Sequence, residues 1–102
     1  MAKKSLEPLT EPMYYVLLSL YRKDFCGADL SSYVQELTDG RVRLVPGTLY
    51  TILSLFQKEK LIYKVLSEGR KITYGITQEG KELYENEMKR LRKCLEDAER
   101  SV

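Results

Sequence analysis

The stretch of sequence that decides the fold is PGTLYTILSLFQKE, residues 46–59. It predicts a helix, because proline suits a first helical turn, whose N–H groups have no backbone partners. Placing successive residues 100° apart gathers the apolar side chains on one side of this helix. These are Leu49, Ile52, Leu53 and Phe56. The opposite side carries Gly47, Thr51, Ser54 and Lys58, with Thr48 and Tyr50 on the flanks. One side is thus expected to face a core, and the other is small and polar.

Two further helices are predicted ahead of this stretch. The first starts near Glu11, where Thr10 offers a capping oxygen and Pro12 fits the first turn. Its buried face is formed by Met13, Val16, Leu17 and Leu20. In the second helix a single apolar stripe is formed by Leu30, Val34 and Leu37. Asp39-Gly40 should end it, because glycine readily adopts the left-handed conformation that follows many helices.

Short strands are expected on both sides of the central helix. Residues 41–44 alternate between arginine and apolar residues, which predicts a strand whose two arginines share a face. Residues 61–66 and 72–76 are rich in β-branched and aromatic residues, and the segment between them has the composition of a turn. The second and third of these segments therefore predict a hairpin with Arg70 and Lys71 at its tip.

A regular apolar spacing marks the last predicted helix, which Thr77 can cap. Steps of four and three residues separate Tyr84, Met88, Leu91, Leu95, Ala98 and Val102. This is the spacing of a coiled-coil seam, which requires a partner helix. The pattern favours a homodimer, while a helix that packs back on its own domain is the alternative.

The distribution of charge separates the middle of the chain from its ends. The net charge is +2, but residues 41–71 hold seven basic and two acidic residues, a local charge of +5. Basic residues concentrated in this way are typical of an element that contacts nucleic acid, although a solvated basic face on any protein can show the same charge distribution.

The residue inventory argues against several classes of protein. The chain has no histidine, and Cys26 and Cys94 lie far apart, so metal ligation and most acid-base or nucleophilic catalysis lack their usual residues. We expect neither an enzyme nor a bound cofactor. No apolar run resembles a signal peptide or a membrane span, which favours the cytoplasm. Cys26, among apolar neighbours, is expected in the core.

The order of predicted elements is helix, helix, short strand, helix, hairpin and long helix. This order is typical of a winged helix-turn-helix, in which the third helix is presented to the major groove and the hairpin touches flanking phosphates. We expect a mainly α-helical fold with a small β-hairpin. Residues 1–76 would form the DNA-binding domain with an N-terminal arm, and residues 77–102 a dimerisation helix.

Three stretches also resemble a known family. LTEPMYYVLL (residues 9–18), PGTLY (46–50) and YGITQEG (74–80) are similar to signature stretches of PadR-type transcriptional regulators, in particular the compact subgroup with one short C-terminal helix. The resemblance implies a dimeric repressor of stress, detoxification or efflux genes that a small aromatic or multidrug ligand can release. Thr48 and Tyr50 match the family's DNA-facing positions, and Arg70 and Lys71 match its basic wing.

Two features of the chain depart from the family pattern. Val45 stands where members often have a polar residue, so a side-chain cap for the helix at Pro46 is missing. The chain also has no tryptophan, so stacking of planar drugs between paired indoles does not carry over.

Together these observations define two candidate sites. The DNA-binding residues are expected to be Arg41, Arg43, Gly47, Thr48, Tyr50, Thr51, Ser54, Lys58, Arg70 and Lys71. A ligand pocket at the dimer centre would be lined by Tyr14, Tyr15, Met88 and Leu91, for which ordinary interface packing is the alternative. The competing function is a protein-interaction adaptor that keeps the winged fold but does not bind DNA.

Overall fold

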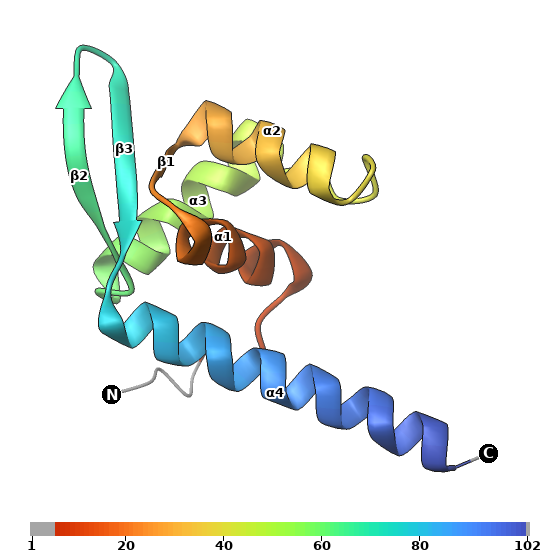
Figure 1. The fold of residues 1–102 in the computed structure, drawn as a ribbon. Helices are drawn as coiled ribbons and strands as arrows, with labels where there is room; N and C mark the ends of the chain where they lie inside the picture. The colour runs from red at the N-terminus through yellow and green to blue at the C-terminus, as the bar shows by residue number, and fades with distance from the viewer. Residues whose placement is uncertain (1–5, 102) are drawn as a thin grey trace.

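A computed structural model describes residues 6–101, so Val102 and the first five residues of the predicted arm lie outside the described chain. Its helices are α1 (Glu11–Arg22), α2 (Gly27–Leu37), α3 (Pro46–Lys58) and α4 (Gln78–Arg100). Its strands are β1 (Phe25–Cys26), β2 (Ile62–Glu68) and β3 (Lys71–Ile76). The first three helices pack together, the hairpin stands at one side, and α4 runs along the base of the molecule (Figure 1). The mainly helical winged fold is confirmed.

The ends of the first two helices follow the signals in the sequence. The Thr10 side-chain oxygen accepts a hydrogen bond of 3.3 Å from the backbone N–H of Met13, which caps α1. After α2, Gly40 has a φ of 77° and donates its N–H to the carbonyl of Gln35 at 2.7 Å. Asp39 is also left-handed, with a φ of 54°. The chain therefore turns sharply where Asp39-Gly40 predicted it would.

The strand predicted for residues 41–44 is wrong. The segment is a loop, although Val42 and Leu44 are buried and Arg41 and Arg43 are exposed. The alternation of burial is real, but the backbone of Val42 bonds to the Thr38 side chain rather than to a strand. Alternation of apolar and polar residues indicates which side chains face the core. A strand also requires a neighbouring strand to pair with, and the alternation does not indicate one.

The sheet has three antiparallel strands in the order β1-β3-β2. Its first strand, β1, pairs Phe25 with Tyr74 and Cys26 with Thr73, and two residues are too few to show a period in sequence. The hairpin is longer than predicted and closes on Gly69-Arg70 alone. Gly69 has a φ of 60°, which suits the first position of a tight hairpin turn. The pairing of β2 with β3 is irregular at Val65.

One core unites the three short helices, the base of the hairpin and the first turns of α4. Its fully buried side chains include Val16, Leu17, Leu30, Val34, Phe56, Leu61 and Leu83. The Thr77 side chain caps α4 by accepting from the backbone N–H of Gly80 at 3.1 Å, as predicted. Towards its C-terminus α4 extends away from the other elements (Figure 1), and every described residue from Lys89 onward is exposed. The predicted seam therefore begins in the buried part of α4 and continues into its exposed part.

Candidate nucleic-acid interface

The outer face of α3 is open and carries small polar side chains. Its predicted residues Gly47, Thr48, Thr51, Ser54 and Lys58 are all exposed, while the opposite face is buried in the core. A Cβ added at Gly47 would have no protein atom within 4 Å. Side chains this short allow a helix to sit deep in a groove about 12 Å wide.

The start of α3 is held by contacts from α2, since Val45 makes no side-chain capping bond. The Ser31 hydroxyl donates to the carbonyl of Leu44 at 3.0 Å, just before the helix begins. The first helical hydrogen bond runs from the Leu49 N–H to the Val45 carbonyl at 2.9 Å. A tertiary hydrogen bond therefore fixes the segment where a capping side chain is missing.

Tyr50 is 50% exposed, and its hydroxyl lies beside the first turn of α2. A Cβ added at Gly27 would lie 2.5 Å from the Tyr50 hydroxyl oxygen. Tyr50 also lines a cavity of about 420 Å³ together with Cys26, Gly27, Ala28, Asp29, Arg70, Lys71, Ile72 and Tyr74. The ring thus borders the space between α3, α2 and the hairpin.

The hairpin tip presents its cations to solvent. Arg70 and Lys71 are exposed, and both line the same cavity as Tyr50. The two hairpin cations share a cavity with Tyr50 of α3, and Lys58 is a further exposed charge at the C-terminal end of that helix. An arrangement of this kind attracts a polyanion that approaches the outer face of α3.

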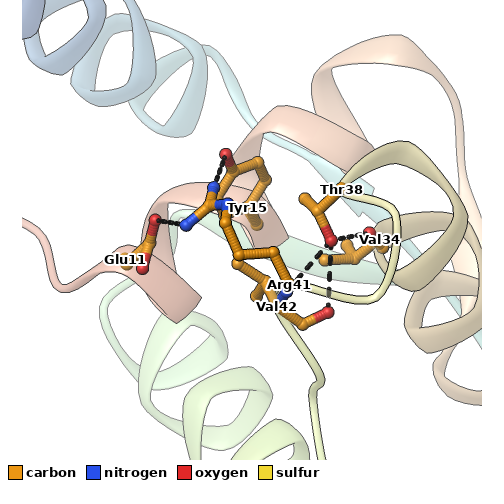
Figure 2. A network of polar contacts seen from close by, with 6 residues as sticks. All are labelled: Glu11, Tyr15, Val34, Thr38, Arg41 and Val42. Atoms are coloured by element: carbon orange, nitrogen blue, oxygen red, sulfur yellow. Dashed lines mark hydrogen bonds and ion pairs between the residues drawn. The ribbon is translucent and has the colours of Figure 1, made fainter.

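The two arginines of the 41–44 loop do not share a face. The Arg41 guanidinium bonds to the Glu11 carboxylate at 2.7 Å and to the Tyr15 hydroxyl at 3.0 Å, both on α1 (Figure 2). The Glu11 carboxylate raises the pKa of Arg41 above its ordinary value, so the side chain stays charged. Arg43 instead lines a hollow at the end of α2 with Glu36 and Asp39. The two arginines therefore lie in different surroundings.

The second predicted site is a cavity of about 250 Å³ between α1 and α4. It is lined by Leu9, Glu11, Tyr14, Tyr15, Glu87, Arg90 and Leu91. Three of the four predicted pocket residues are present, but Met88 lies elsewhere and its sulfur accepts a hydrogen bond from Tyr84. Burial and a hydrogen bond with Tyr84 raise the pKa of Tyr14 to about 12, so its phenol stays neutral. The cavity can therefore offer ring faces and hydroxyl groups to an aromatic guest.

The sequence analysis missed Glu87, the one buried acidic group of this cavity among the described residues. Its carboxylate is 2% exposed and accepts from the Leu9 backbone N–H at 3.0 Å. Arg90 donates to the same carboxylate through Nε at 2.8 Å and Nη2 at 2.7 Å. The Arg90 guanidinium lowers the pKa of Glu87, so the carboxylate remains ionised despite burial. Glu87 stands one helical turn from both Leu83 and Leu91, and this position beside the apolar stripe is the signal that could have indicated its burial.

The predicted seam divides within α4. Tyr84 is 3% exposed, and the centroid of its ring lies 5.4 Å from the ring centroid of Tyr14 and 4.8 Å from that of Tyr21, both on α1. Tyr84 therefore packs within its own chain and is not exposed for a partner. Leu91 and Leu95 are 41% and 59% exposed, and Ala98 on the same stripe is exposed too. An unpaired apolar stripe thus remains on the distal half of the helix.

Residues 6–101 contain neither a metal-binding cluster nor a membrane-spanning helix. In this part of the chain no three metal-binding side chains gather. No helix there combines the length and apolar character that crossing a membrane requires. Cys26 is buried, as expected, and Cys94 is exposed.

Solved structures with the same architecture are transcriptional regulators. A regulator from Clostridium thermocellum is 23% identical, with a TM-score of 0.78 over 88% of this chain and 91% of that one. A PadR family regulator from Clostridium difficile is 22% identical, with a TM-score of 0.72 over 86% and 94%. Bacillus subtilis PadR, solved in complex with operator DNA, is 22% identical, with a TM-score of 0.65 over 78% of this chain and 47% of that chain. At these identities the likeness shows the fold.

Comparison by sequence gives the family. None of the curated proteins that were compared matches the chain. The family model described as the transcriptional regulator PadR-like family matches residues 16–86, which include α2, α3, the hairpin and the first turns of α4. Since this match covers most of the chain and agrees with the winged architecture, the protein belongs to the PadR-like family of transcriptional regulators.

Proposed function

We propose that the protein is a sequence-specific DNA-binding repressor that acts as a homodimer and is released by a small aromatic ligand. The observation that carries this proposal is the open outer face of α3, bordered by the exposed cations of the hairpin tip. Bacillus subtilis PadR, which has a similar fold, was solved with operator DNA. Fold and surface chemistry thus support the same class of partner.

In this proposal the outer face of α3 enters the major groove of operator DNA. Thr48, Thr51 and Ser54 have hydroxyl groups that can meet base edges, while Arg70 and Lys71 neutralise flanking phosphates. Hydroxyl contacts would distinguish sequences, and the cations would add affinity to any duplex. Arg43 and Lys58 are exposed and remain candidates for phosphate contacts.

Dimerisation is proposed through the distal half of α4. Leu91, Leu95 and Ala98 form the exposed stripe, and Val102 would continue it beyond the described residues. A parallel copy of the same stripe would bury these side chains, as the spacing of four and three residues predicts. Two reading helices could then meet two half-sites of one duplex.

The cavity between α1 and α4 is the proposed ligand site. It borders Leu91, the first exposed residue of the stripe, so a guest there would contact the region where two subunits meet. Tyr14 and Tyr15 offer an edge-to-face pair of rings with centroids 5.4 Å apart. An aromatic guest that packs against them could change the angle between the two DNA-binding units. A panel of planar aromatic compounds that changed neither DNA affinity nor melting temperature would remove this part of the proposal.

A binding titration tests the DNA-binding function. Labelled duplex from the region upstream of the gene is compared with a duplex of the same composition and shuffled sequence, at several salt concentrations. A specific repressor should prefer the upstream duplex by about a thousand-fold or more. If about five to eight phosphates are neutralised by a dimer, log K should fall against log salt with a slope of roughly −5 to −7. Weak and equal retention of both duplexes would favour the adaptor function instead.

A further inference from the structure

Arg41 makes its contacts within the chain, although charge and position suggested a contact to DNA. Figure 2 shows its guanidinium at the start of α1, where Nη1 donates to the Glu11 carboxylate and Nη2 donates to the Tyr15 hydroxyl oxygen. The two bonds occupy both ends of the planar group, at 2.7 Å and 3.0 Å. Two of the five N–H donors of the guanidinium are thus engaged, and together they fix its direction toward α1.

The backbone that carries Arg41 is fixed at the end of α2. The Arg41 N–H donates to the Thr38 carbonyl at 3.0 Å, and the Val42 N–H donates to the Thr38 hydroxyl oxygen at 3.0 Å. The Thr38 hydroxyl in turn donates to the Val34 carbonyl at 2.8 Å (Figure 2). The Arg41 side chain therefore links this fixed turn to a third element, α1.

The segment that follows determines where α3 begins. Four residues separate Arg41 from Pro46, and Val45 gives α3 no side-chain cap. Buried Val42 and Leu44 hold this segment from within, and the Ser31 bond to the Leu44 carbonyl holds it from α2. Arg41 supplies the contact from the α1 side. The first turn of α3 is thus placed by contacts to both neighbouring helices.

We infer that Arg41 is a positioning residue that holds the first turn of α3 in the orientation used to read DNA, by fastening the preceding loop to Glu11 and Tyr15. The inference rests on the proposed DNA-binding function and assigns Arg41 no contact with the duplex. The size of the effect is limited, because both charged partners are more than half exposed. An exposed ion pair of this kind changes an equilibrium by about two- to five-fold.

The test compares Arg41→Ala with Tyr15→Phe. Tyr15→Phe removes one hydroxyl from α1, keeps the ring and leaves every basic residue in place. Both variants should weaken binding to the upstream duplex by about two- to five-fold. The double variant should bind only slightly more weakly than Arg41→Ala alone, because both changes break the same link. The slope of log K against log salt should stay at the wild-type value, because the protein still neutralises the same phosphates.

Two control variants show what removing a cation does by itself. Arg70→Ala should make the salt slope shallower by about one for each phosphate that is no longer neutralised. Arg43→Ala removes the same charge from the same loop without touching Glu11 or Tyr15, so it should not show coupling to Tyr15→Phe. If Arg41→Ala makes the slope shallower as Arg70→Ala does, and Tyr15→Phe binds like wild type, Arg41 is a phosphate contact and the inference is wrong.

Hydrogen exchange of the free protein gives a readout that does not depend on DNA. The Val42 N–H is bonded to Thr38 and the Leu49 N–H to Val45, so they report on the loop and on the first turn of α3. Both amides should exchange about two- to five-fold faster in Arg41→Ala and in Tyr15→Phe. Unchanged exchange in both variants would overturn the inference even where the wild-type protein binds its operator. Failure of the wild type to bind any upstream duplex would overturn the proposed function, while faster exchange of both amides in the two variants would still show that Arg41 holds the loop and the first turn of α3.

Discussion

The Glu87 carboxylate in the middle of α4 accepts a hydrogen bond of 3.0 Å from the backbone N–H of Leu9, 78 residues earlier in the chain. Leu9 is 7% exposed and belongs to the core. The bond therefore fastens the segment before α1 to the helix on which the proposed dimer depends. Arg90 completes the group by donating twice to the same carboxylate.

Replacing Glu87 with glutamine should destabilise the fold. The amide keeps the size of the side chain, but its NH₂ group faces the donors of Arg90, so a buried polar group is left poorly satisfied. We expect the free energy of unfolding to fall by about 1–3 kcal/mol. Urea denaturation measures this. Glu82→Gln on the exposed side of α4 is the matched control and should stay within about 0.5 kcal/mol of wild type.

The same residue predicts a dependence of stability on pH. The pKa of Glu87 in the folded protein lies below its ordinary value of 4.5, because Arg90 stabilises the carboxylate. The stabilisation is complete above the ordinary pKa and is lost as the pH falls through the lower pKa of the folded state. The melting temperature of the wild type should therefore decrease as the pH is lowered past about 4.5, and the melting temperature of Glu87→Gln should decrease less. Parallel curves for the two proteins would contradict this role.

Much of the fold follows from local signals, and the exceptions have a common physical origin. The caps at Thr10 and Thr77 and the turn at Gly40 were predicted from sequence because each is made within a few residues of the helix end. The β1 strand pairs with β3 some fifty residues away, and nothing local announces such a partner. The strand predicted for residues 41–44 was wrong because a loop and a strand can show the same alternation of buried and exposed residues.

The candidate sites show the same limit. The outer face of α3 was predicted from its period, because a helix in contact with a core needs only one apolar side. The contacts of Arg41 and Glu87 were not predicted, since each depends on groups from a distant part of the chain. Charge alone assigned Arg41 to DNA, whereas the structure gives it two partners on α1.

The hairpin and the reading helix should affect DNA binding differently. Replacing Arg70 and Lys71 with alanine should weaken binding to specific and shuffled duplexes by the same factor, because phosphates carry no sequence information. Replacing Thr48 with alanine should change the order of preference among operator variants, by about 1–3 kcal/mol for a base it contacts. Competition binding with a panel of single-base variants measures both effects. A uniform decrease in affinity for Thr48→Ala would count against its place in the groove.

A charge in the exposed stripe of α4 should dissociate the proposed dimer without unfolding the subunit. In Leu95→Asp, two carboxylates would face each other across the two-fold axis, while the 59% exposure of Leu95 means that the isolated subunit loses little packing. Sedimentation equilibrium should show monomers, with a circular dichroism spectrum close to that of wild type. Lys89→Asp on the opposite side of α4 changes more charge and should remain dimeric. A Leu95→Asp dimer of unchanged affinity would place the interface elsewhere.

Gly27 and Gly47 both stand in the first turn of a helix, but they should respond differently to alanine. Neither has a φ in the left-handed region, so alanine would favour the helix by about 0.5–1 kcal/mol if space allowed. Space exists at Gly47, where a Cβ meets nothing within 4 Å, whereas at Gly27 it lies 2.5 Å from the Tyr50 hydroxyl oxygen. Gly27→Ala should therefore displace the Tyr50 ring, and because this ring is half exposed and can move aside, the cost in stability should be under about 1 kcal/mol. In a Tyr50→Ala background the same change should become neutral or stabilising, and thermal denaturation of the four proteins measures this coupling. Equal destabilisation by Gly27→Ala in both backgrounds would show that Tyr50 is not the neighbour that requires glycine at this position.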